Sequence, residues 1–120
     1  MDGPSARVEV RCPGSPPFLR LARLATADAG SRAGLSVDQI EDLRIAVSEL
    51  CALVGGDDVE LTLVFTTTDG SVEVDGTGGP GLPDGEGAEM AQALVAAVVD
   101  EHDIQVDPTN TTFHVLKRAH

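Results

Sequence analysis

The chain of 120 residues has almost no aromatic side chains, with three phenylalanines, no tryptophan and no tyrosine. Its core must therefore be built from valine, leucine, isoleucine and alanine. Valine favours strands, whereas leucine and alanine favour helices. Hydrophobic residues still make up 42% of the sequence, which is enough for a globular interior. The composition predicts one domain, residues 1–120, that mixes helices and strands.

Positive charge is also scarce. Eight lysines and arginines stand against twenty acidic residues, so the formal net charge is −12. A nucleic-acid-binding face must neutralise phosphates, and anionic membranes attract basic segments, so neither partner is expected. A basic protein surface is the partner that charge alone favours, and a solvated acidic exterior is the simpler alternative.

Signals for disulfides, metals and membranes are absent. The two cysteines, Cys12 and Cys51, form no CxxC motif, and two reduced thiols are typical of a cytoplasmic protein. The three histidines show no metal-ligand spacing, so no metal site is expected. No segment reaches the roughly 20 apolar residues of a membrane span, and residues 1–4 do not resemble the start of a signal peptide.

Periodicity predicts the order of the secondary structure. Alternating apolar and polar residues indicate strands, and apolar residues at helical spacing indicate helices. The strands are expected at 7–12, 59–65, 71–75, 104–106 and 111–117, and the helices at 18–32, 36–54 and 88–99. Strands that arrive in adjacent pairs predict an α/β two-layer sandwich, with a mixed or antiparallel sheet covered on one face by the three helices.

Local signals fix some of the boundaries. Ser36 and Gln39 fit a capping box at the start of the second helix. Residues 66–70 are expected to contain a turn, and residues 76–87 are expected to form a loop because they are rich in glycine, proline and aspartate. The helix at 88–99 is strongly apolar and is expected to be mostly buried.

Three segments resemble, in this order, the anti-sigma-factor serine/threonine kinase branch of the GHKL (histidine kinase-like) ATPase family. Residues 41–51 are similar to the family helix E-D-L-x-x-A-V-x-E-A-x-x-N, and this match is the specific one. Residues 72–79 are similar to the strand and D-x-G-x-G box of the family. Residues 85–101 are similar to its G-x-G-L helix with a D-E ending. The resemblance covers nearly the whole chain and implies the Bergerat-type fold.

The family helix places two candidate site residues. By resemblance, Glu49 falls at the glutamate that acts as general base towards the attacking hydroxyl. Leu53 falls at the asparagine that ligates Mg²⁺ and lies four residues further on, on the same helix face. Leucine offers no oxygen, whereas Mg²⁺ requires oxygen ligands. The sequence therefore favours no bound cofactor, with ATP and Mg²⁺ as the alternative.

The second of the three segments, which contains the D-x-G-x-G box, also departs from the family pattern. By resemblance, Asp75 falls at the aspartate that binds the adenine amino group. The box glycines fall at Thr77 and Gly79, so the first one is lost. Gly76 and Gly78 offer a shifted register. Asp75 and Gly79 are candidate nucleotide contacts on this basis.

The third segment, which contains the G-x-G-L box, can be aligned with the family pattern in two registers. In one, Gly85 and Gly87 are the family glycines, and their amides are candidate phosphate contacts at a helix start. In the other, residues 100–101 set the register, the glycine positions fall at Glu89 and Ala91, and the phosphate site is absent. Acidic side chains beside these positions repel phosphate in either case.

We therefore expect a regulatory protein-binding domain with a degenerate ATP site. By resemblance its partner is a sigma factor or a STAS-type anti-anti-sigma factor, and the chain forms a homodimer through its first helix, where Arg20 and Arg23 are candidate interface residues. One alternative is an active serine/threonine kinase that phosphorylates a STAS protein, and another is an inactive subunit of an intact paralogue. The plainest alternative is that Glu49 is a solvated helix residue and Asp75 a strand end.

Overall fold

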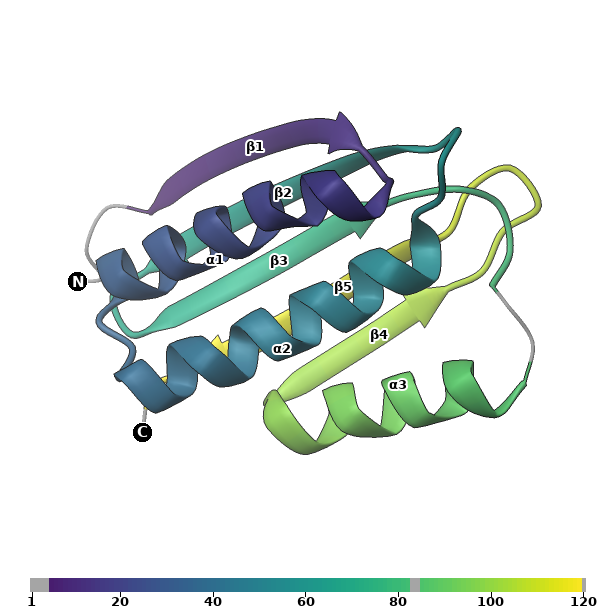
Figure 1. Cartoon of the computed structure of the whole chain (residues 1–120). Helices are drawn as coiled ribbons and strands as arrows, with labels where there is room; N and C mark the ends of the chain where they lie inside the picture. The colour runs from purple at the N-terminus through teal and green to yellow at the C-terminus, as the bar shows by residue number, and fades with distance from the viewer. Residues whose placement is uncertain (1–4, 83–84, 120) are drawn as a thin grey trace.

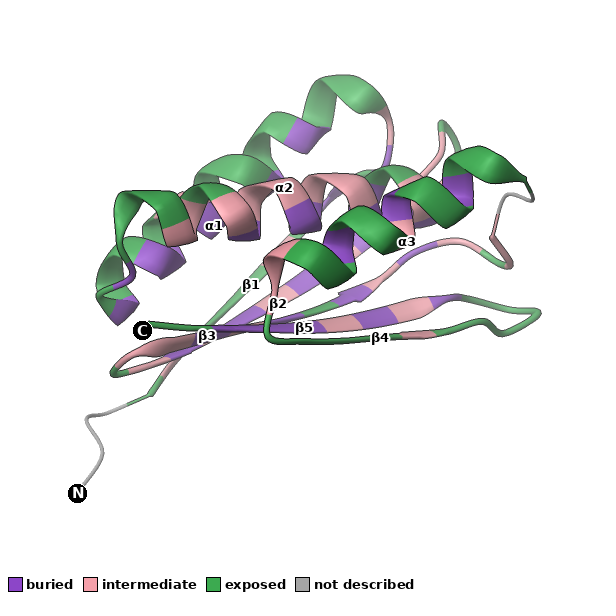
Figure 2. Cartoon of the chain, turned by 90° about the horizontal axis from the view of Figure 1, so that it is seen from below, coloured by how far each residue is buried: buried purple, intermediate pink, exposed green. Residues whose placement is uncertain are grey.

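The computed structural model describes residues 5–82 and 85–119. Within these residues, five strands form one sheet in the order β1-β2-β3-β5-β4. Every neighbouring pair is antiparallel, which decides between the mixed and antiparallel alternatives. Figures 1 and 2 show that the helices lie together on one face of this sheet. The expected two-layer sandwich is thus confirmed.

The elements follow the predicted order β-α-α-β-β-loop-α-β-β. They are β1 (Ala6–Pro13), the short 3₁₀ helix η1 (Pro16–Phe18), α1 (Leu19–Ala33), α2 (Val37–Val54), β2 (Glu60–Thr68), β3 (Ser71–Thr77), α3 (Glu86–Val98), β4 (Glu101–Gln105) and β5 (Thr112–Arg118).

The turn predicted within residues 66–70 is present, but it is limited to residues 69–70. Residues 66–68 continue β2, because they pair with β3 and the first two of them also pair with β1. Two local predictions are wrong. β4 begins at Glu101 rather than at Ile104, and its first three residues are exposed, so no buried face marks them in the sequence. The third helix is mostly exposed rather than mostly buried, since only Ala88, Ala91 and Val95 of α3 are buried.

The core lies between the sheet and the helical layer. Successive residues of β2 and β3 alternate between buried and more exposed positions, so one face of each strand supplies the core. Full burial of a large apolar side chain contributes about 1.5–3 kcal/mol. The largest fully buried apolar side chains are Phe65, Leu43, Leu50, Leu61, Leu63, Val47, Val54, Val72, Val74, Val95 and Val115.

Helix α2 is the central element of the helical layer and contacts both α1 and α3 (Figure 1). It starts with the predicted capping box. The Gln39 amide donates to Ser36 Oγ at 3.1 Å, and the Ser36 amide donates to Gln39 Oε1 at 2.8 Å. The two hydrogen bonds satisfy backbone donors that would otherwise lack a partner at the helix start.

Lys117 connects the sheet to this layer. Its side chain lies on the helix-facing side of β5 and is only 9% exposed. Nζ donates to the Val98 carbonyl at 2.8 Å and to Asp42 Oδ2 at 3.3 Å. One buried ammonium group thus joins the end of α3, the middle of α2 and the last strand.

The two cysteines are buried free thiols. Burial raises the pKa of the Cys51 thiol to about 12, and Cys12 adds a smaller effect in the same direction. Burial also raises the pKa of the Cys12 thiol, with a further contribution from Glu60. Both thiols therefore stay protonated near neutral pH, and a protonated thiol is a poor nucleophile.

Among the helices that the structure describes, none has both the length and the apolar content that a bilayer span requires. The described residues also contain no cluster of three or more His, Cys, Asp or Glu side chains that could hold a metal ion.

Candidate functional site

The two candidate site residues of α2 lie one helical turn apart on the same ridge. Glu49 is half-buried, and its side chain makes no hydrogen bond or ion pair with any described residue. It borders two hollows, one towards α1 and one towards α3. Leu53 borders a third hollow at the end of the helix. The described hollows of the helical layer therefore all border this ridge of α2.

The hollow towards α1 is small and carries both charge signs. It measures about 300 Å³, and Arg23 Nε donates to Ser48 Oγ across it at 3.1 Å. Arg44 donates to Glu41 at 3.0 Å, while the Nε of Arg44 is buried without a partner among the described residues. Of the two arginines expected at an interface, Arg23 thus already contacts α2. Arg20 is exposed, and its side chain contacts no described polar group.

The hollow towards α3 is larger and mostly apolar. It measures about 430 Å³, and its lining residues are Glu49, Gly87, Met90, Ala91 and Leu94. The structure therefore brings two predicted site residues, Glu49 and Gly87, to one hollow.

The hollow beside Leu53 offers no oxygen ligand from a side chain. It measures about 300 Å³ and lies between the end of α2, Val59 and the loop at 79–82. Leu53 is half-buried and packs against the core, and Leu82 packs against the core from the loop. Every described residue in its lining is glycine, proline, valine or leucine. Because Mg²⁺ takes oxygen ligands in near-octahedral order, these side chains do not fit a bound magnesium ion.

Three amides of the glycine-rich loop donate hydrogen bonds within the protein. The Gly78 amide donates to the Thr111 carbonyl at 3.0 Å, and the Gly79 amide donates to the Val54 carbonyl at 2.8 Å. The Gly81 amide donates to the Asp107 carbonyl at 3.4 Å. A loop that binds phosphate must present free amides to it. These three amides instead fasten the loop to α2 and to the segment before β5.

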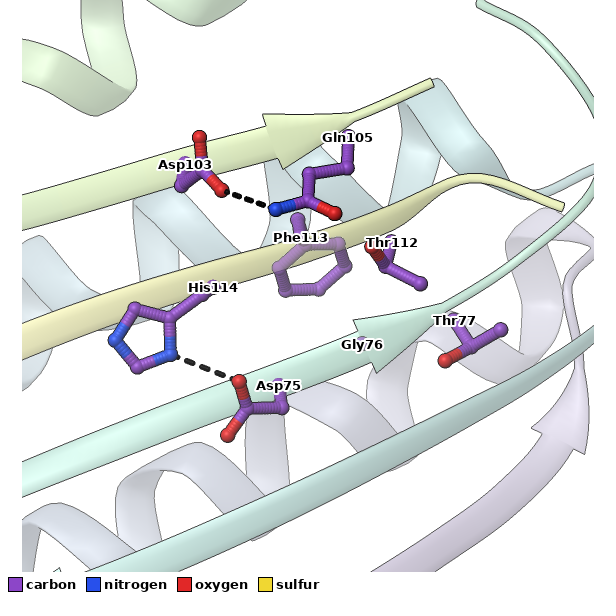
Figure 3. Close-up of a pocket in the computed structure, with 8 residues that line it drawn as sticks. All are labelled: Asp75, Gly76, Thr77, Asp103, Gln105, Thr112, Phe113 and His114. Carbon is purple, nitrogen blue, oxygen red and sulfur yellow. Dashed lines mark hydrogen bonds and ion pairs between the residues drawn. The ribbon is translucent and has the colours of Figure 1, made fainter. Parts of the chain in front are cut away.

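Asp75 lies on the opposite face of the sheet from Glu49. Residues on β3 alternate in burial, with Val74 and Gly76 facing the helices and Asp75 facing away from them. Nδ1 of His114, on the paired strand β5, lies 2.8 Å from Oδ1 of Asp75 (Figure 3). Nε2 of the same ring lies 4.0 Å from Oε1 of Glu73. A carboxylate accepts hydrogen bonds, so the Nδ1 atom carries the proton. One small ligand cannot contact Glu49 and Asp75 together, because the sheet separates them.

Gly76 occupies the position on β3 that faces the helices at this level. A Cβ atom built on Gly76 would lie 2.2 Å from the ring of Phe113. The ring therefore fills the space into which a longer side chain at position 76 would project. Beneath the helices, position 76 thus presents a glycine that packs against a phenylalanine ring. In the shifted register that the sequence left open, no carboxylate lies at this position.

The third glycine box lies at the start of α3. Gly85 has φ 111° and precedes the helix, and Gly87 lies in its first turn. Glu86 and Glu89 share that turn, so a phosphate there would meet two negative charges. The alternative register depends on residues 100–101, and both of these contact Arg118: the Arg118 amide donates to Asp100 Oδ2 and its guanidinium pairs with Glu101, each at 2.7 Å. Both registers stay predictions.

Sequence reasoning missed two features of these hollows. The pairing of Asp75 with His114 depends on strand register, which no local pattern reveals. The face of the sheet on which Asp75 lies could have been predicted from the sequence, however. Val72 and Val74 mark the buried face, and Asp75 is out of phase with them. The exposure of Met90 and Leu94 was not expected, since apolar composition alone does not show which face of a helix is covered.

Three kinds of comparison relate this geometry to known proteins. No protein-family model matches the chain. Over 74 residues it is 36% identical to the serine-protein kinase RsbW of Listeria monocytogenes serotype 4a (strain HCC23), an alignment that covers 57% of this chain and 47% of that protein. Over 44 residues it is 43% identical to the serine-protein kinase RsbW of Bacillus subtilis (strain 168), covering 37% of this chain and 28% of that protein.

A solved structure has the same fold. The RsbU and RsbW domains of Rv1364c from Mycobacterium tuberculosis superpose with a TM-score of 0.70 at 17% identity, over 94% of this chain and 32% of that chain. The chain spans about half the length, or less, of the curated relatives that it matches. Together the matches show homology to RsbW-like anti-sigma-factor serine kinases of the GHKL type.

Proposed function

We propose that this homologue of RsbW-like serine kinases is a regulatory protein-binding domain that acts without transferring phosphate. Its partner in this proposal is a sigma factor or a STAS-type anti-anti-sigma factor. The observation that carries the proposal is the apolar hollow at Leu53, where no described side chain supplies an oxygen ligand. Phosphoryl transfer relies on a metal ion to neutralise the charge that develops on the phosphate.

Two further observations support the loss of the nucleotide site. The amides of Gly78 and Gly79 donate to protein carbonyls, so they are not free to bind phosphate. Asp75, the candidate adenine contact, lies across the sheet from Glu49 and is bound to His114. A candidate base therefore remains on α2 without a metal ligand, a phosphate-binding loop or an adenine contact beside it.

The surface proposed for partner contact and for dimerisation is the outer face of η1 and α1. Three large apolar side chains are exposed there at helical spacing, Phe18 at 40%, Leu21 at 47% and Leu24 at 61%. Arg20 lies among them in the sequence and is exposed. An apolar stripe with an arginine has the composition that protein interfaces favour.

Titration with Mg-ATP tests the proposal. We expect no heat of binding at millimolar ATP, for the wild type or for Leu53→Asn, because the loop amides and the adenine contact are missing as well. Val37→Asn, at an 83% exposed position at the start of α2, is the matched control for adding an amide. Thermal unfolding of each variant shows that it is folded.

A transfer assay tests the alternative of an active kinase. The full chain is incubated with labelled ATP, Mg²⁺ and a purified STAS protein from the same genome. We expect no label on the STAS protein, with Glu49→Gln as the matched control. Label on a partner serine that disappears in Glu49→Gln would overturn the proposal and establish the kinase reading.

A further inference from the structure

Helix α3 buries small residues and exposes large ones. Its buried residues are Ala88, Ala91 and Val95, whereas Met90 is 71% exposed and Leu94 is 41% exposed. Figure 2 shows that most of α3 is exposed. The usual distribution is the reverse, since leucine and methionine are among the residues most often buried. Met90 and Leu94 are four residues apart, so they form one ridge along the helix.

This ridge borders the largest of the described hollows. We use the name α2–α3 groove for the surface formed by Glu49, Gly87, Met90, Ala91 and Leu94, which encloses about 430 Å³. A Cβ atom built on Gly87 would meet no atom within 4 Å, so the groove is open at the start of α3. Its volume falls in the range of side-chain and small-ligand pockets.

The only charge in the groove is negative and has no partner among the described residues. Glu49 makes no side-chain contact with a described cation, because Arg23 is bonded to Ser48 and Arg44 to Glu41. None of the five residues that line the groove is basic. An apolar groove that holds an unpaired carboxylate is complementary to an apolar surface that carries lysine or arginine.

We propose that the α2–α3 groove binds an amphipathic helix of a protein partner. An apolar side chain of that helix enters the hollow between Met90 and Leu94, and a lysine or arginine of the helix pairs with Glu49. α2 and α3 pack against each other. The groove runs over two turns of α3, from Gly87 to Leu94, beside Glu49 of α2, which suits a docked helix. This inference rests on the proposed function, because a nucleotide at Glu49 would compete for the same groove.

Other occupants fit the charges less well. A nucleotide brings phosphates to the Glu49 carboxylate, and an anionic membrane brings the same repulsion. A second copy of this chain is placed at η1 and α1 in the proposed function, so it does not occupy this groove. A basic helix is the occupant for which both the apolar lining and the charge are favourable.

Two synthetic peptides test the groove. Both are 18-residue helical peptides with leucine at two positions four residues apart. One carries lysine at the flanking positions, and the other carries glutamate there. Titrated into the isotope-labelled full chain, the lysine peptide is expected to shift the amide signals of Glu49, Gly87, Met90, Ala91 and Leu94. By fluorescence anisotropy it is expected to bind at least tenfold more tightly than the glutamate peptide.

Matched variants separate the two parts of the contact. Met90→Ser and Leu94→Ser are each expected to weaken the lysine peptide about tenfold, and Glu49→Lys is expected to reverse the preference between the peptides. Val37→Ser, which changes an 83% exposed valine at the far end of α2, is expected to leave binding unchanged. Thermal unfolding of each variant shows that the fold is retained.

Several outcomes would overturn the groove proposal: no binding of the lysine peptide, equal binding of both peptides, or signal shifts that map to α1 instead. Full binding by both serine variants would do the same. A separate titration of the same labelled chain with Mg-ATP addresses the proposed function. Saturable shifts around Leu53 and Gly79 would overturn that function, whereas the peptide results alone decide the groove.

Discussion

The two glycine-rich segments that resemble family boxes differ in what surrounds them. At Gly76, Gly78 and Gly79, an added Cβ atom would lie within 3 Å of another atom. At Gly85 and Gly87, it would meet nothing within 4 Å. The first segment uses glycine because neighbouring atoms leave no room, and the second uses it at the open start of a helix. A glycine pattern in a sequence does not distinguish these roles.

The largest effect is expected at Gly78. Its added Cβ would lie 2.2 Å from the Val54 carbonyl oxygen, which is backbone and cannot rotate away. Gly78→Ala should therefore lower the free energy of unfolding by about 3 kcal/mol or more, measured by urea denaturation. A cost below about 1 kcal/mol would mean that the loop moves off α2 freely, and the contrast between the two segments would fail.

A smaller cost is expected at Gly76, because its neighbour is a side chain. The Phe113 ring lies 2.2 Å from the added Cβ and must move. We expect Gly76→Ala to cost about 2 kcal/mol, and Phe113→Leu to recover at least half of that cost in the double variant. Additive effects in this double-mutant cycle would show that the ring is not what excludes a side chain at position 76.

Within the open segment, Gly85 should still be sensitive. Its φ of 111° and ψ of −176° lie in a region that is almost restricted to glycine. Gly85→Ala should cost about 1–2 kcal/mol through backbone strain alone. Amide hydrogen exchange should speed up in the first turn of α3. Unchanged exchange and stability would place the strain elsewhere.

The smallest effect, and one of opposite sign, is expected at Gly87. This residue lies in the first turn of α3 with nothing near its added Cβ. Gly87→Ala should stabilise the chain by about 0.5 kcal/mol because alanine favours helix more than glycine does. The same measurement on Gly78→Ala is the matched control. Destabilisation by Gly87→Ala would erase the distinction between the segments.

The sequence predicted what depends on local pattern. Ser36 and Gln39 predicted the start of α2, because a capping box acts within a few residues. The alternation of apolar and polar residues in 59–65 and 71–75 predicted β2 and β3, because burial on one face of a strand also follows a local pattern. β4 was misplaced because residues 101–103 are all exposed at a sheet edge. For the candidate site, the sequence predicted that Leu53 stands where a metal ligand is expected, and this stays a prediction. The hydrogen bond from the Gly79 amide to the Val54 carbonyl could not be predicted, since it depends on two segments meeting in space.

The position of Lys117 limits how the folded chain can be modified. It is the only lysine in the sequence, and its Nζ atom is held between Val98 and Asp42. Acetyl transfer, ubiquitin attachment and amine-reactive dyes all need an accessible, unprotonated lysine amine. The native domain does not present one, so lysine-directed tagging of this chain requires β5 to separate from the helices first.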